Sequence, residues 1–573
     1  MHKTIRAALI CGLAGLTPFQ SFAQSSQYQV HIGDKHRDKV HPLTPLGSDN
    51  DGNVYAFGMR AKLQYLIPLV FVWSYRVGIH PYVKKYDKDM NFLADYPLRG
   101  ENGVASNLAD GHIGVTTAMM FGTFSVYNAT PHSFRWGNNA YIATPNLTKQ
   151  NFYLVRLGLD GTMQEAQPML TASKQSLTDK VLKSTEVESK FSPDSSYVAF
   201  IFKSKSGKKQ SAYASVFDRS MKRQWTTSFS LPAGRGKGKI DQQIAVSNSG
   251  QIYILTVQDA RKDDPGSATL LQLDGQKGRK PLPMRFNNAG LYISDVKLTL
   301  TNENKPAIVG FYRDSKRRMT GHDGLVYGMP DGDGNFIVSR KQPFDLAMVS
   351  SIFTEKEKKK AERKVRRGKD ISEDPDFHFL DFFPTADGGA IAIAEEQYLV
   401  VSSHTSGTGN NTRIVTDYIY HYGDIMMVKV GSDFHIEWVR KAAKHNSFTQ
   451  PIDIQPYVKN YSPVMMDNKV YVLFNDVKGL EGNVHSRKQR NQYDGSASTY
   501  IVSISSEGTL DRDEAVRSAD IHGYSINLSR GIYTEGGKIY FIATPNGPFK
   551  VFSKKTRLGS ITLPAKQNAL SMQ

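Results

Sequence analysis

A short apolar strand that follows a turn rich in Gly, Asn and Asp recurs along the chain, usually with an aromatic residue at its centre. These turn residues tolerate the left-handed backbone of tight hairpins, so each copy predicts the start of a β-hairpin. The copies occupy Asp51–Phe57, Asn138–Ala143, Asp194–Phe200, Ser249–Leu255, Asn304–Val309, Asp387–Ile393, Asp467–Leu473 and Gly536–Ile542. Further strands end in similar turns, at Asp160-Gly161, Asp274-Gly275 and Glu507-Gly508.

The spacing of these copies indicates one architecture. Tyr141, Tyr197, Tyr253 and Ile308 follow one another at intervals of 55 or 56 residues, which is near the length of a four-stranded propeller blade. Longer intervals elsewhere are interpreted as blades with insertions. A chain of 573 residues is too long for one ordinary core, but a repeat architecture enlarges its core by addition. The sequence therefore predicts an all-β fold: a single β-propeller over residues 24–563, followed by a C-terminal tail at 564–573. Seven or eight blades are expected, depending on whether the terminal units share one.

Two segments stand out as insertions. Residues 355–370 have a helix-forming composition and almost no apolar face, and residues 355–369 hold nine Lys or Arg against three Glu. Residues 402–416 are rich in Ser, Thr, Gly and Asn and predict a flexible loop at one rim of the ring. For the first insertion we expect a basic helix, either solvated or in contact with an anionic partner through Lys358, Lys359, Lys360, Arg363, Lys364, Arg366 and Arg367.

A second apolar run, at Leu63–Val77, is rich in β-branched and aromatic residues. Pro68 interrupts it, and it is too short to span a bilayer, which takes roughly 20 residues. The composition favours a buried strand pair, and a membrane anchor is the alternative.

The N-terminus is typical of a secretory signal peptide over residues 1–23. Lys3 and Arg6 form a basic start, an apolar stretch follows, and the small residues Ser21 and Ala23 predict the cleavage site. We therefore expect an exported protein in the periplasm, at the outer membrane or on the cell surface, without a transmembrane span. Cys11 is the only cysteine, so its removal with the signal leaves no disulfide, thiolate ligand or thiol nucleophile.

The formal net charge of +18 narrows the classes of partner. A basic exported protein favours acidic glycans, lipopolysaccharide or an anionic membrane face, and a merely soluble basic surface is the alternative. Nucleic acid is not expected as a partner, because an exported chain rarely meets it.

The chain lacks a G-x-S-x-G elbow, an H-E-x-x-H pair and a phosphate-binding glycine loop. Two acidic turns, Asp49–Asn53 and Asp331–Asn335, place oxygen atoms at alternate positions, as in calcium loops. Neither turn has the distal Glu of an EF-hand, and a hairpin turn is needed at both places in any case. Ca²⁺ held by Asp49, Asp51, Asp331 and Asp333 is therefore an alternative to plain turn chemistry, and no other cofactor is expected.

The strongest polar cluster lies in the sixth unit. Period-two geometry places Glu395 on the same strand face as Ile391 and Ile393, where a carboxylate must be paired or must face the central channel. Glu396 follows it, and the partner strand offers Tyr418, Tyr420, His421 and Tyr422. Three hypotheses follow: acid–base chemistry on a sugar by Glu395, Glu396 and His421, ligand binding by the tyrosines, or a hydrogen-bond network between blades.

The segment Phe191–Phe200, FSPDSSYVAF, resembles the FSPDG-type repeat of TolB-like propellers. Residues 300–480 resemble more specifically a group of secreted Bacteroidota β-propeller proteins to which no activity is assigned. The shared features are the Lys-rich segment 355–369, Phe377–Phe383, Asp387-Gly388-Gly389, Ala394–Tyr398, Tyr418–Val430 and Leu473–Asp476. The resemblance implies an exported β-propeller of the cell envelope and implies no reaction.

Two hypotheses of function follow. The first is a non-catalytic scaffold for protein interactions in the cell envelope, whose partner is an envelope protein or an outer-membrane complex. The second is a propeller that binds glycans or acts on them in the manner of a lyase or glycosidase.

Overall fold

The computed structural model describes most of the chain, and the structural statements below concern that part. Residues 1–27, and with them the predicted signal peptide and Cys11, lie outside it, as does nearly all of the predicted tail. The described residues are 28–34, 36–37, 41–69, 72–100, 111–118, 124–126, 132–136, 139–146, 151–169, 185–204, 210–231, 240–258, 267–275, 282–287, 291–301, 303–313, 322–331, 335–344, 346–351, 353–368, 377–407, 413–433, 435–450, 461–466, 468–476, 498–517, 521, 523–528, 532–545 and 555–564.

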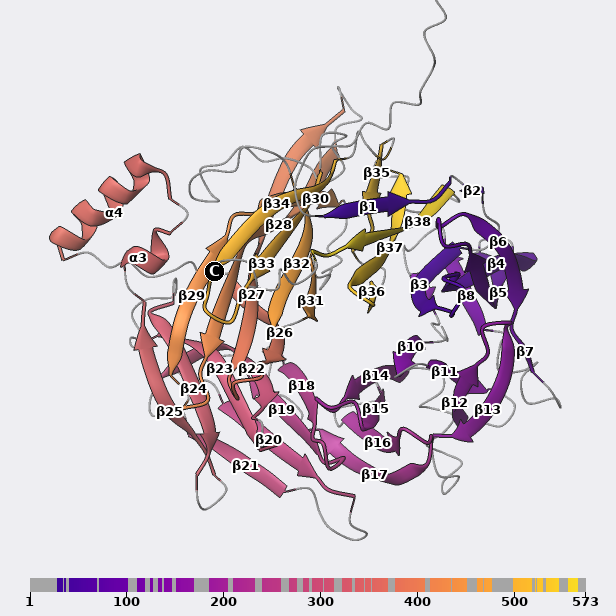
Figure 1. Cartoon of the computed structure of the whole chain (residues 1–573), viewed down its shortest axis with the longest axis horizontal. Coiled ribbons are helices and arrows are strands. Elements are labelled where there is room, and N and C mark those ends of the chain that lie inside the picture. Colours follow the sequence, from indigo (N-terminus) through magenta and orange to yellow (C-terminus); the bar gives the residue numbers. More distant parts are fainter. Residues whose placement is uncertain are drawn as a thin grey trace, which may run out of the picture.

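Antiparallel pairing groups consecutive strands into runs that are arranged around a common centre (Figure 1). In the first half of the chain the runs are β3 (His41–Ser48), β4 (Val54–Leu69), β5 (Val72–Tyr86) and β6 (Phe92–Pro97); β10 (His132–Trp136), β11 (Asn139–Asn146), β12 (Asn151–Leu157) and β13 (Thr162–Pro168); β14 (Thr185–Phe191), β15 (Tyr197–Ser204), β16 (Gln210–Asp218) and β17 (Arg223–Leu231); and β18 (Ile240–Val246), β19 (Ile252–Gln258), β20 (Ser267–Leu273) and β21 (Leu282–Asn287).

In the second half the runs are β22 (Tyr292–Leu300), β23 (Pro306–Arg313), β24 (Gly324–Pro330) and β25 (Phe336–Pro343); β26 (Phe377–Pro384), β27 (Ala390–Ser406), β28 (Arg413–Val430) and β29 (Ile436–Ala442); β31 (Ser462–Met466), β32 (Lys469–Asp476), β33 (Ser498–Ile504) and β34 (Leu510–Arg517); and β35 (Tyr524–Ile526) with β36 (Tyr533–Glu535), β37 (Lys538–Pro545) and β38 (Lys555–Thr562). The short strands β2 (His36–Arg37), β7 (Arg99–Gly100) and β30 (Asn446–Gln450) pair with β38, β13 and β28.

The predicted repeat is confirmed, since the recurring apolar strand is the second strand in seven runs, and in the last run it is β37, with which both β35 and β36 pair. Its residues are deeply buried; Val198 to Phe202 on β15, for example, are at most 1% exposed. The apolar clusters lie between neighbouring runs, so that Ala199 and Ile201 pack with Ile244 and Ile252 of the next run. The all-β propeller fold is thereby confirmed. The blade count of seven or eight stays a prediction, because the parallel pairing of β21 with β25 merges two runs into one sheet.

The last run is completed by the start of the chain. Strand β1 (Gln29–Ile32) pairs antiparallel with β38, in register from Gln29 opposite Thr562 to Ile32 opposite Gly559. Tyr28 joins the apolar cluster of this sheet, and Val30 and Ile32 pack against it. The terminal segments therefore share one sheet, which closes the ring.

A recurring contact joins one run to the next and explains the D/E-G turns of the sequence. An aromatic residue on a fourth strand lies over the glycine in the turn between the third and fourth strands of the following run. The aromatic–glycine pairs are Tyr96 with Gly161, Trp225 with Gly275 and Trp438 with Gly508, and each glycine has a φ between 72° and 84°. Glycine is required for the positive φ. A Cβ atom would meet the indole ring of Trp225 or Trp438 at Gly275 and Gly508, and the Cβ and backbone oxygen of Tyr96 at Gly161.

Replacing Gly508 with alanine tests this contact. A Cβ atom there would lie 2.9 Å from the Trp438 ring, at φ +81°. The control is Gly523→Ala, because Gly523 has φ +77° and no atom within 4 Å of the added Cβ. We expect Gly523→Ala to cost about 1–2 kcal/mol of stability from backbone strain alone. Gly508→Ala should cost roughly 1–3 kcal/mol more through overpacking, measured by urea unfolding. Equal losses would show that Trp438 moves aside freely.

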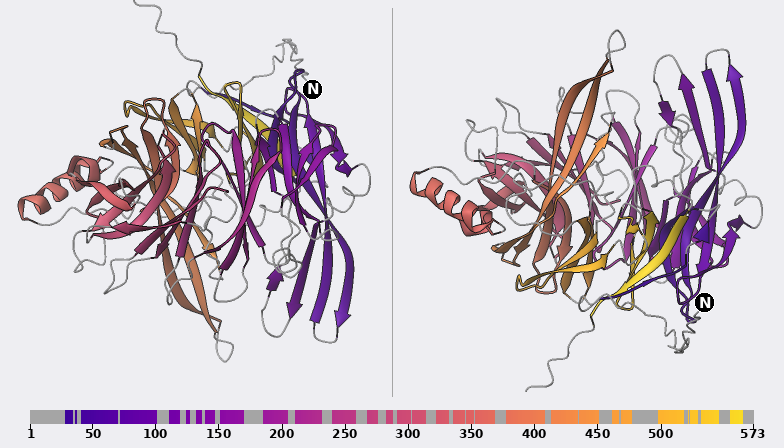
Figure 2. Two further views of the ribbon diagram at one scale, coloured as in Figure 1. Left: turned by 90° about the horizontal axis from the view of Figure 1, so that it is seen from below. Right: turned by 90° about the horizontal axis from the view of Figure 1, so that it is seen from above.

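Two hairpins extend well beyond the ring, and both views in Figure 2 show them leaving the same face. One is the outer part of β4–β5, where β5 also pairs with β8 (Gly111–Ala118), and β8 with β9 (Phe124–Val126). The strand pairing predicted at Leu63–Val77 is thus confirmed, and the predicted burial of this pair stays a prediction. The other is the outer part of β27–β28, paired from Gln397 opposite Tyr422 to Ser406 opposite Arg413.

The prediction of a loop over 402–416 is therefore wrong for residues 402–406 and 413–416. These residues continue the two strands, from Ser402 opposite Asp417 to Ser406 opposite Arg413. The composition suggested a loop because Ser and Thr are common in turns, yet antiparallel pairing with a neighbouring strand satisfies their backbone equally well.

Two helices lie outside the ring (Figure 1). The short helix α3 (Leu346–Val349) packs on the ring through Val349. The helix α4 (Glu355–Arg366) confirms the helix predicted for the basic insertion. No helix in the described residues is long and apolar enough to cross a membrane.

Candidate functional site

The acidic pair of the sixth unit lies at an irregularity in strand pairing. The register of β27 against β28 shifts between Glu395 and Gln397, as in a β-bulge, where an extra residue changes the direction of the side chains. Both carboxylates are consequently buried, Glu395 at 0% and Glu396 at 1% exposure. Glu395 is fully buried, as are Ile391 and Ile393.

Glu395 is paired with a lysine that the sequence did not single out. Lys444, also 0% exposed, forms an ion pair with Glu395 Oε1, and Gln397 Nε2 donates a 2.8 Å hydrogen bond to Oε2. The backbone N–H of Lys444 donates to Asp424 Oδ1 at 3.1 Å. A buried carboxylate is costly unless it is paired in this way. Lys444 follows β29 and is far from Glu395 along the chain, so no sequence motif predicts that these two residues pair.

Glu396 packs against the backbone of β28. Its Oε2 accepts a long hydrogen bond of 3.4 Å from the backbone N–H of Asp424. A Cβ atom on Gly423 would lie 2.3 Å from that oxygen, so any side chain at this position would displace the Glu396 carboxylate. Tyr461, fully buried nearby, has a pKa well above its ordinary value because of burial and, next, the charges of Asp381 and Glu395.

The predicted aromatic residues on β28 are mostly inaccessible. Tyr420, His421 and Tyr422 are 7%, 6% and 2% exposed, and Tyr418 is half-buried. The His421 ring stacks on Tyr398 with 4.4 Å between centroids and an angle of 9°. The tyrosines therefore do not form an open platform for a ligand; Tyr420 and Tyr422 belong to the packing of the sheet.

The cluster continues into the next run. The His445 backbone N–H donates to Asp476 Oδ2 at 3.2 Å, and the Asn446 amide donates to the Asn475 carbonyl oxygen. Asn475 in turn donates to the Ile526 carbonyl oxygen at 2.9 Å and accepts from Thr499 at 2.7 Å. The residues Glu395, Lys444, His445, Asn446, Asn475 and Asp476 are called the polar junction below.

The polar junction thus connects β27 and β28 with β32, β33 and β35. Of the three hypotheses for Glu395, Glu396 and His421, its geometry favours the hydrogen-bond network between blades. Catalysis by these residues needs a carboxylate that a substrate can reach, and neither Glu395 nor Glu396 is exposed beyond 1%.

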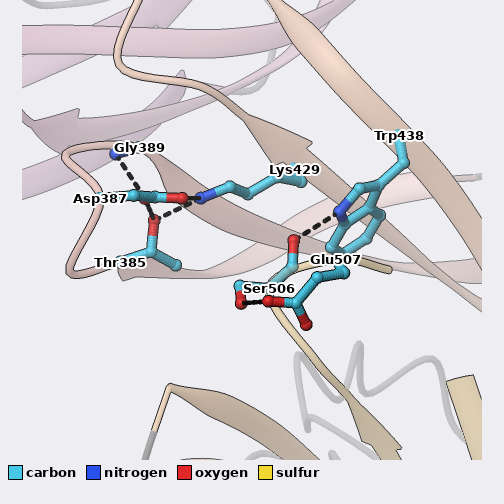
Figure 3. A network of polar contacts seen from close by, with 7 residues as sticks. All are labelled: Thr385, Asp387, Gly389, Lys429, Trp438, Ser506 and Glu507. Carbon is cyan, nitrogen blue, oxygen red and sulfur yellow. Dashed lines mark hydrogen bonds and ion pairs between the residues drawn. The ribbon is translucent and has the colours of Figure 1, made fainter. Parts of the chain in front are cut away.

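A second buried lysine in the same sheet anchors the Asp387-Gly388-Gly389 turn (Figure 3). Lys429 is 0% exposed, and its Nζ lies 2.6 Å from Asp387 Oδ2 and 2.6 Å from Thr385 Oγ1. The Gly389 N–H donates to Asp387 Oδ1 at 3.0 Å. Burial alone raises the pKa of Asp387, but the hydrogen bonds from Lys429, Thr385 and Gly389 outweigh it and lower this pKa to about 2.

The lowered pKa predicts how stability depends on pH. A carboxyl group whose pKa is lower in the folded state stabilises the fold above its unfolded pKa, here 3.8, and loses that contribution as the pH falls through about 2. We expect Asp387→Asn to cost about 1–2 kcal/mol at pH 6, since Asp387 is half-exposed and partly screened. The loss should shrink towards pH 2, as measured by thermal unfolding at both pH values. A loss independent of pH would contradict the ionised pair.

The carboxylates of the acidic turns accept hydrogen bonds from neighbouring residues of the chain. Asp49 Oδ1 accepts hydrogen bonds from the N–H groups of Asp51 and Asn53, and Oδ2 accepts from the Asn53 amide and the Tyr55 hydroxyl, all within 3.0 Å. Asp331 accepts equivalent bonds from Asn335, and Asp333 lies outside the described residues. No group of three potential metal ligands occurs in the described part of the chain. Calcium binding stays a prediction.

A cavity of about 500 Å³ lies where the first strands of four consecutive runs converge, β14, β18, β22 and β26. Sequence analysis missed it because single polar residues on separate strands form no motif. Lys297 Nζ donates to the Leu380 carbonyl oxygen at 2.7 Å, and Glu188 pairs with Lys190 at 3.9 Å. The polar side chains of the lining belong to Glu188, Lys190, Gln242, Gln243, Lys297, Thr299 and Asp381.

No protein-family profile and no curated protein sequence matches the chain. Similar solved structures include the β-propeller domain of the Trilobed protease from Pyrococcus furiosus, at 9% identity over 80% of this chain and 97% of that one, with a TM-score of 0.30. The β-propeller domain of Nup133 from Vanderwaltozyma polyspora shares 11% identity over 75% of this chain and all of that one, with a TM-score of 0.30. The polysaccharide lyase Uly1 shares 12% identity over 81% and 93%, with a TM-score of 0.31. Likenesses at this level carry no argument about activity, and the resemblance to TolB-like and Bacteroidota propellers stays a prediction.

Proposed function

We propose that this chain is an exported, non-catalytic β-propeller that acts as a scaffold for a protein partner in the cell envelope. The observation that carries the proposal is helix α4, an ordered basic helix held outside the ring. Its partner is an acidic surface of another envelope protein.

Helix α4 is stabilised by local hydrogen bonds and has no buried face. It begins with a capping box in which the Glu357 N–H donates to Thr354 Oγ1 and Glu357 Oε2 accepts from the Thr354 N–H at 3.0 Å. None of its residues is buried. An isolated helix of 12 residues is marginal in water, so contact with a partner would stabilise it further.

The charge on α4 determines the kind of partner. Two of its glutamates are paired within the helix, Glu355 with Lys358 at 3.0 Å and Glu362 with Arg366 at 3.7 Å. The other basic residues of the helix and its C-cap, Lys356, Lys359, Lys360, Arg363, Lys364 and Arg367, leave a net positive surface. Carboxylates of a partner can be attracted to and paired with this surface.

A charge reversal tests the proposal. The variant Lys359→Glu/Lys360→Glu/Arg363→Glu is compared with Lys88→Glu/Lys469→Glu/Lys538→Glu, which makes the same charge change at exposed positions elsewhere. We expect cross-linked affinity purification from the native envelope to recover a stoichiometric protein with the wild type and with the control. Recovery of the partner should fall at least tenfold with the α4 variant, because the reversal turns attractive charge pairs at the interface into repulsive ones.

Two outcomes would overturn the scaffold proposal. Equal recovery of the partner with both variants would show that α4 is not part of the interface. Recovery of no partner above background would favour the second hypothesis, a glycan ligand, for which the cavity between β14, β18, β22 and β26 is a candidate site.

A further inference from the structure

The outer ribbon, residues 397–406 of β27 and 413–422 of β28, presents an exposed strand edge. Seven consecutive residues of β27, Leu399–Thr405, are exposed. Within the described residues, β27 pairs with β28 alone beyond Glu396. On its other side β28 pairs with β30, opposite Tyr418–Tyr422. Strand β27 is therefore the edge of this sheet, and the backbone N–H and C=O groups along that edge are able to pair with a further strand.

This edge lacks the features that protect edge strands from pairing with another chain, such as charged residues and proline. The segment Gln397–Ser406 reads QYLVVSSHTS and contains no Lys, Arg, Asp, Glu, Pro or Gly. Its pairing with β28 is continuous, because the register shift lies before Gln397. By contrast, the fourth strands of other runs carry charges, among them Asp95 on β6, Glu165 on β13, Arg223 on β17, Arg440 on β29 and Asp513 on β34.

Exposed apolar side chains are concentrated on the same ribbon. Of the six large hydrophobic residues that are exposed in the described part of the chain, Leu399, Val400 and Val401 lie on β27 and Ile414 lies on β28. The three on β27 are opposite Tyr418–Tyr420, where β30 adds a third strand. Three paired strands form a more stable platform than an isolated hairpin. A concentration of exposed apolar groups on such a platform marks an interaction site.

We propose that two copies of the chain associate through this edge, with their β27 segments paired antiparallel about a two-fold axis. A strand that meets the edge along its length must be extended and uncharged, because the edge offers no charge to pair with. The same segment of a second copy meets this requirement, and a two-fold interface brings identical patches of two copies together. This inference goes beyond the scaffold proposal and does not rest on helix α4.

The distribution of charge permits this association although the whole chain is basic. The formal net charge is +18, but the two charged residues of the outer ribbon, Arg413 and Asp417, cancel each other. Ten strand residues extend roughly 30 Å, so antiparallel ribbons keep the two rings apart by more than the Debye length of about 8 Å at physiological ionic strength. One strand pair buries less area than a standard interface of about 1,600 Å², so we expect a reversible dimer.

Sedimentation velocity of the mature chain between about 1 and 100 µM tests the proposal, because a reversible dimer dissociates on dilution. The variant Val401→Lys/Ser403→Lys places like charges along the edges of both copies and should raise the dissociation constant of the dimer at least tenfold. The control Ser228→Lys/Ser230→Lys adds the same charge at exposed positions of β17 and should leave this constant unchanged. A chain that is monomeric at about 100 µM, or equal dissociation constants for the two variants, would overturn the proposal.

Single cysteines along the edge test the antiparallel arrangement. The mature chain has no other cysteine, because Cys11 lies in the predicted signal peptide. A disulfide requires two Cα atoms within about 7 Å of each other, and in an antiparallel pair only residues at the two-fold axis lie this close to their own copy. A scan from Leu399→Cys to Thr405→Cys under a mild oxidant should therefore give a disulfide dimer at one position or at two adjacent positions.

The control for the scan is Leu93→Cys, an exposed position on β6, which should give no disulfide dimer. Dimers at every scanned position would indicate parallel stacking or non-specific aggregation and would contradict the proposal. The α4 charge reversal should leave the dissociation constant of the dimer unchanged, so failure of the scaffold proposal and failure of this one are distinguishable.

Discussion

Replacing Lys444 with methionine is expected to destabilise the protein by about 3–5 kcal/mol, because removal of one partner leaves a buried charge uncompensated. Lys444 and Glu395 are both 0% exposed, and they form a direct ion pair. Methionine keeps most of the side-chain volume, so the loss reports the missing charge and not a cavity. The measurement is urea unfolding followed by circular dichroism, with thermal unfolding as a second readout.

Two comparisons make this result specific. Lys305→Met removes an exposed pair with Glu303, whose partners are 61% and 73% exposed, and should cost less than about 1 kcal/mol. The double variant Lys444→Met/Glu395→Gln removes the stranded carboxylate and should recover a substantial part of the loss. If Lys444→Met were as stable as the wild type, the polar junction would not depend on this pair, and a role for Glu395 in ligand chemistry would regain support.

Deletion of residues 28–34 is expected to prevent closure of the ring. These residues include β1, the outer strand of the last sheet, and Tyr28, Val30 and Ile32, which contribute to its apolar cluster. Their removal eliminates the burial of these three apolar side chains, each worth about 1.5–3 kcal/mol when fully buried, and exposes the edge of β38. An unpaired edge strand is also a template for aggregation.

We expect the deletion variant to unfold at a temperature at least 10 °C lower and to elute partly as aggregates in size-exclusion chromatography.

A matched pair of substitutions in β1 separates the effect of burial from the effect of charge. Val30→Asp places a carboxylate on the half-buried face of β1 and should destabilise, whereas Gln29→Asp places it on the exposed face and should not. A synthetic peptide of residues 24–34 should restore stability in a concentration-dependent way. A deletion variant with wild-type stability would show that β1 does not close the ring.

The three pairs between an aromatic residue and a glycine connect the sequence pattern with the architecture. The turns at Asp160-Gly161, Asp274-Gly275 and Glu507-Gly508 were identifiable as turns because Gly tolerates a positive φ. That each glycine also receives Tyr96, Trp225 or Trp438 of the preceding run was not identifiable, because the aromatic residue lies on a different sheet. The same residues thus serve local turn geometry and contact between sheets.

The features that the sequence alone determined depend on residues that are close together in the chain. The recurring apolar strands, such as Tyr197–Phe200, and their spacing predicted an all-β propeller, because alternation, turn residues and periodicity depend only on residues close together in the chain. The helix over Glu355–Arg366 was predictable for the same reason, since its capping box and composition are local. The burial of Glu395 followed from its position two residues after Ile393.

Contacts between distant segments were decided only by the tertiary structure. The partner of Glu395 is Lys444, the polar junction joins separate runs, and β1 completes the sheet of β38. The outer ribbon of β27–β28 was predicted as a loop, because Ser402–Ser406 lacks apolar alternation and its pairing depends on the facing strand. In each case the free energy comes from groups far apart in sequence, whose approach is set by how the blades assemble around the ring.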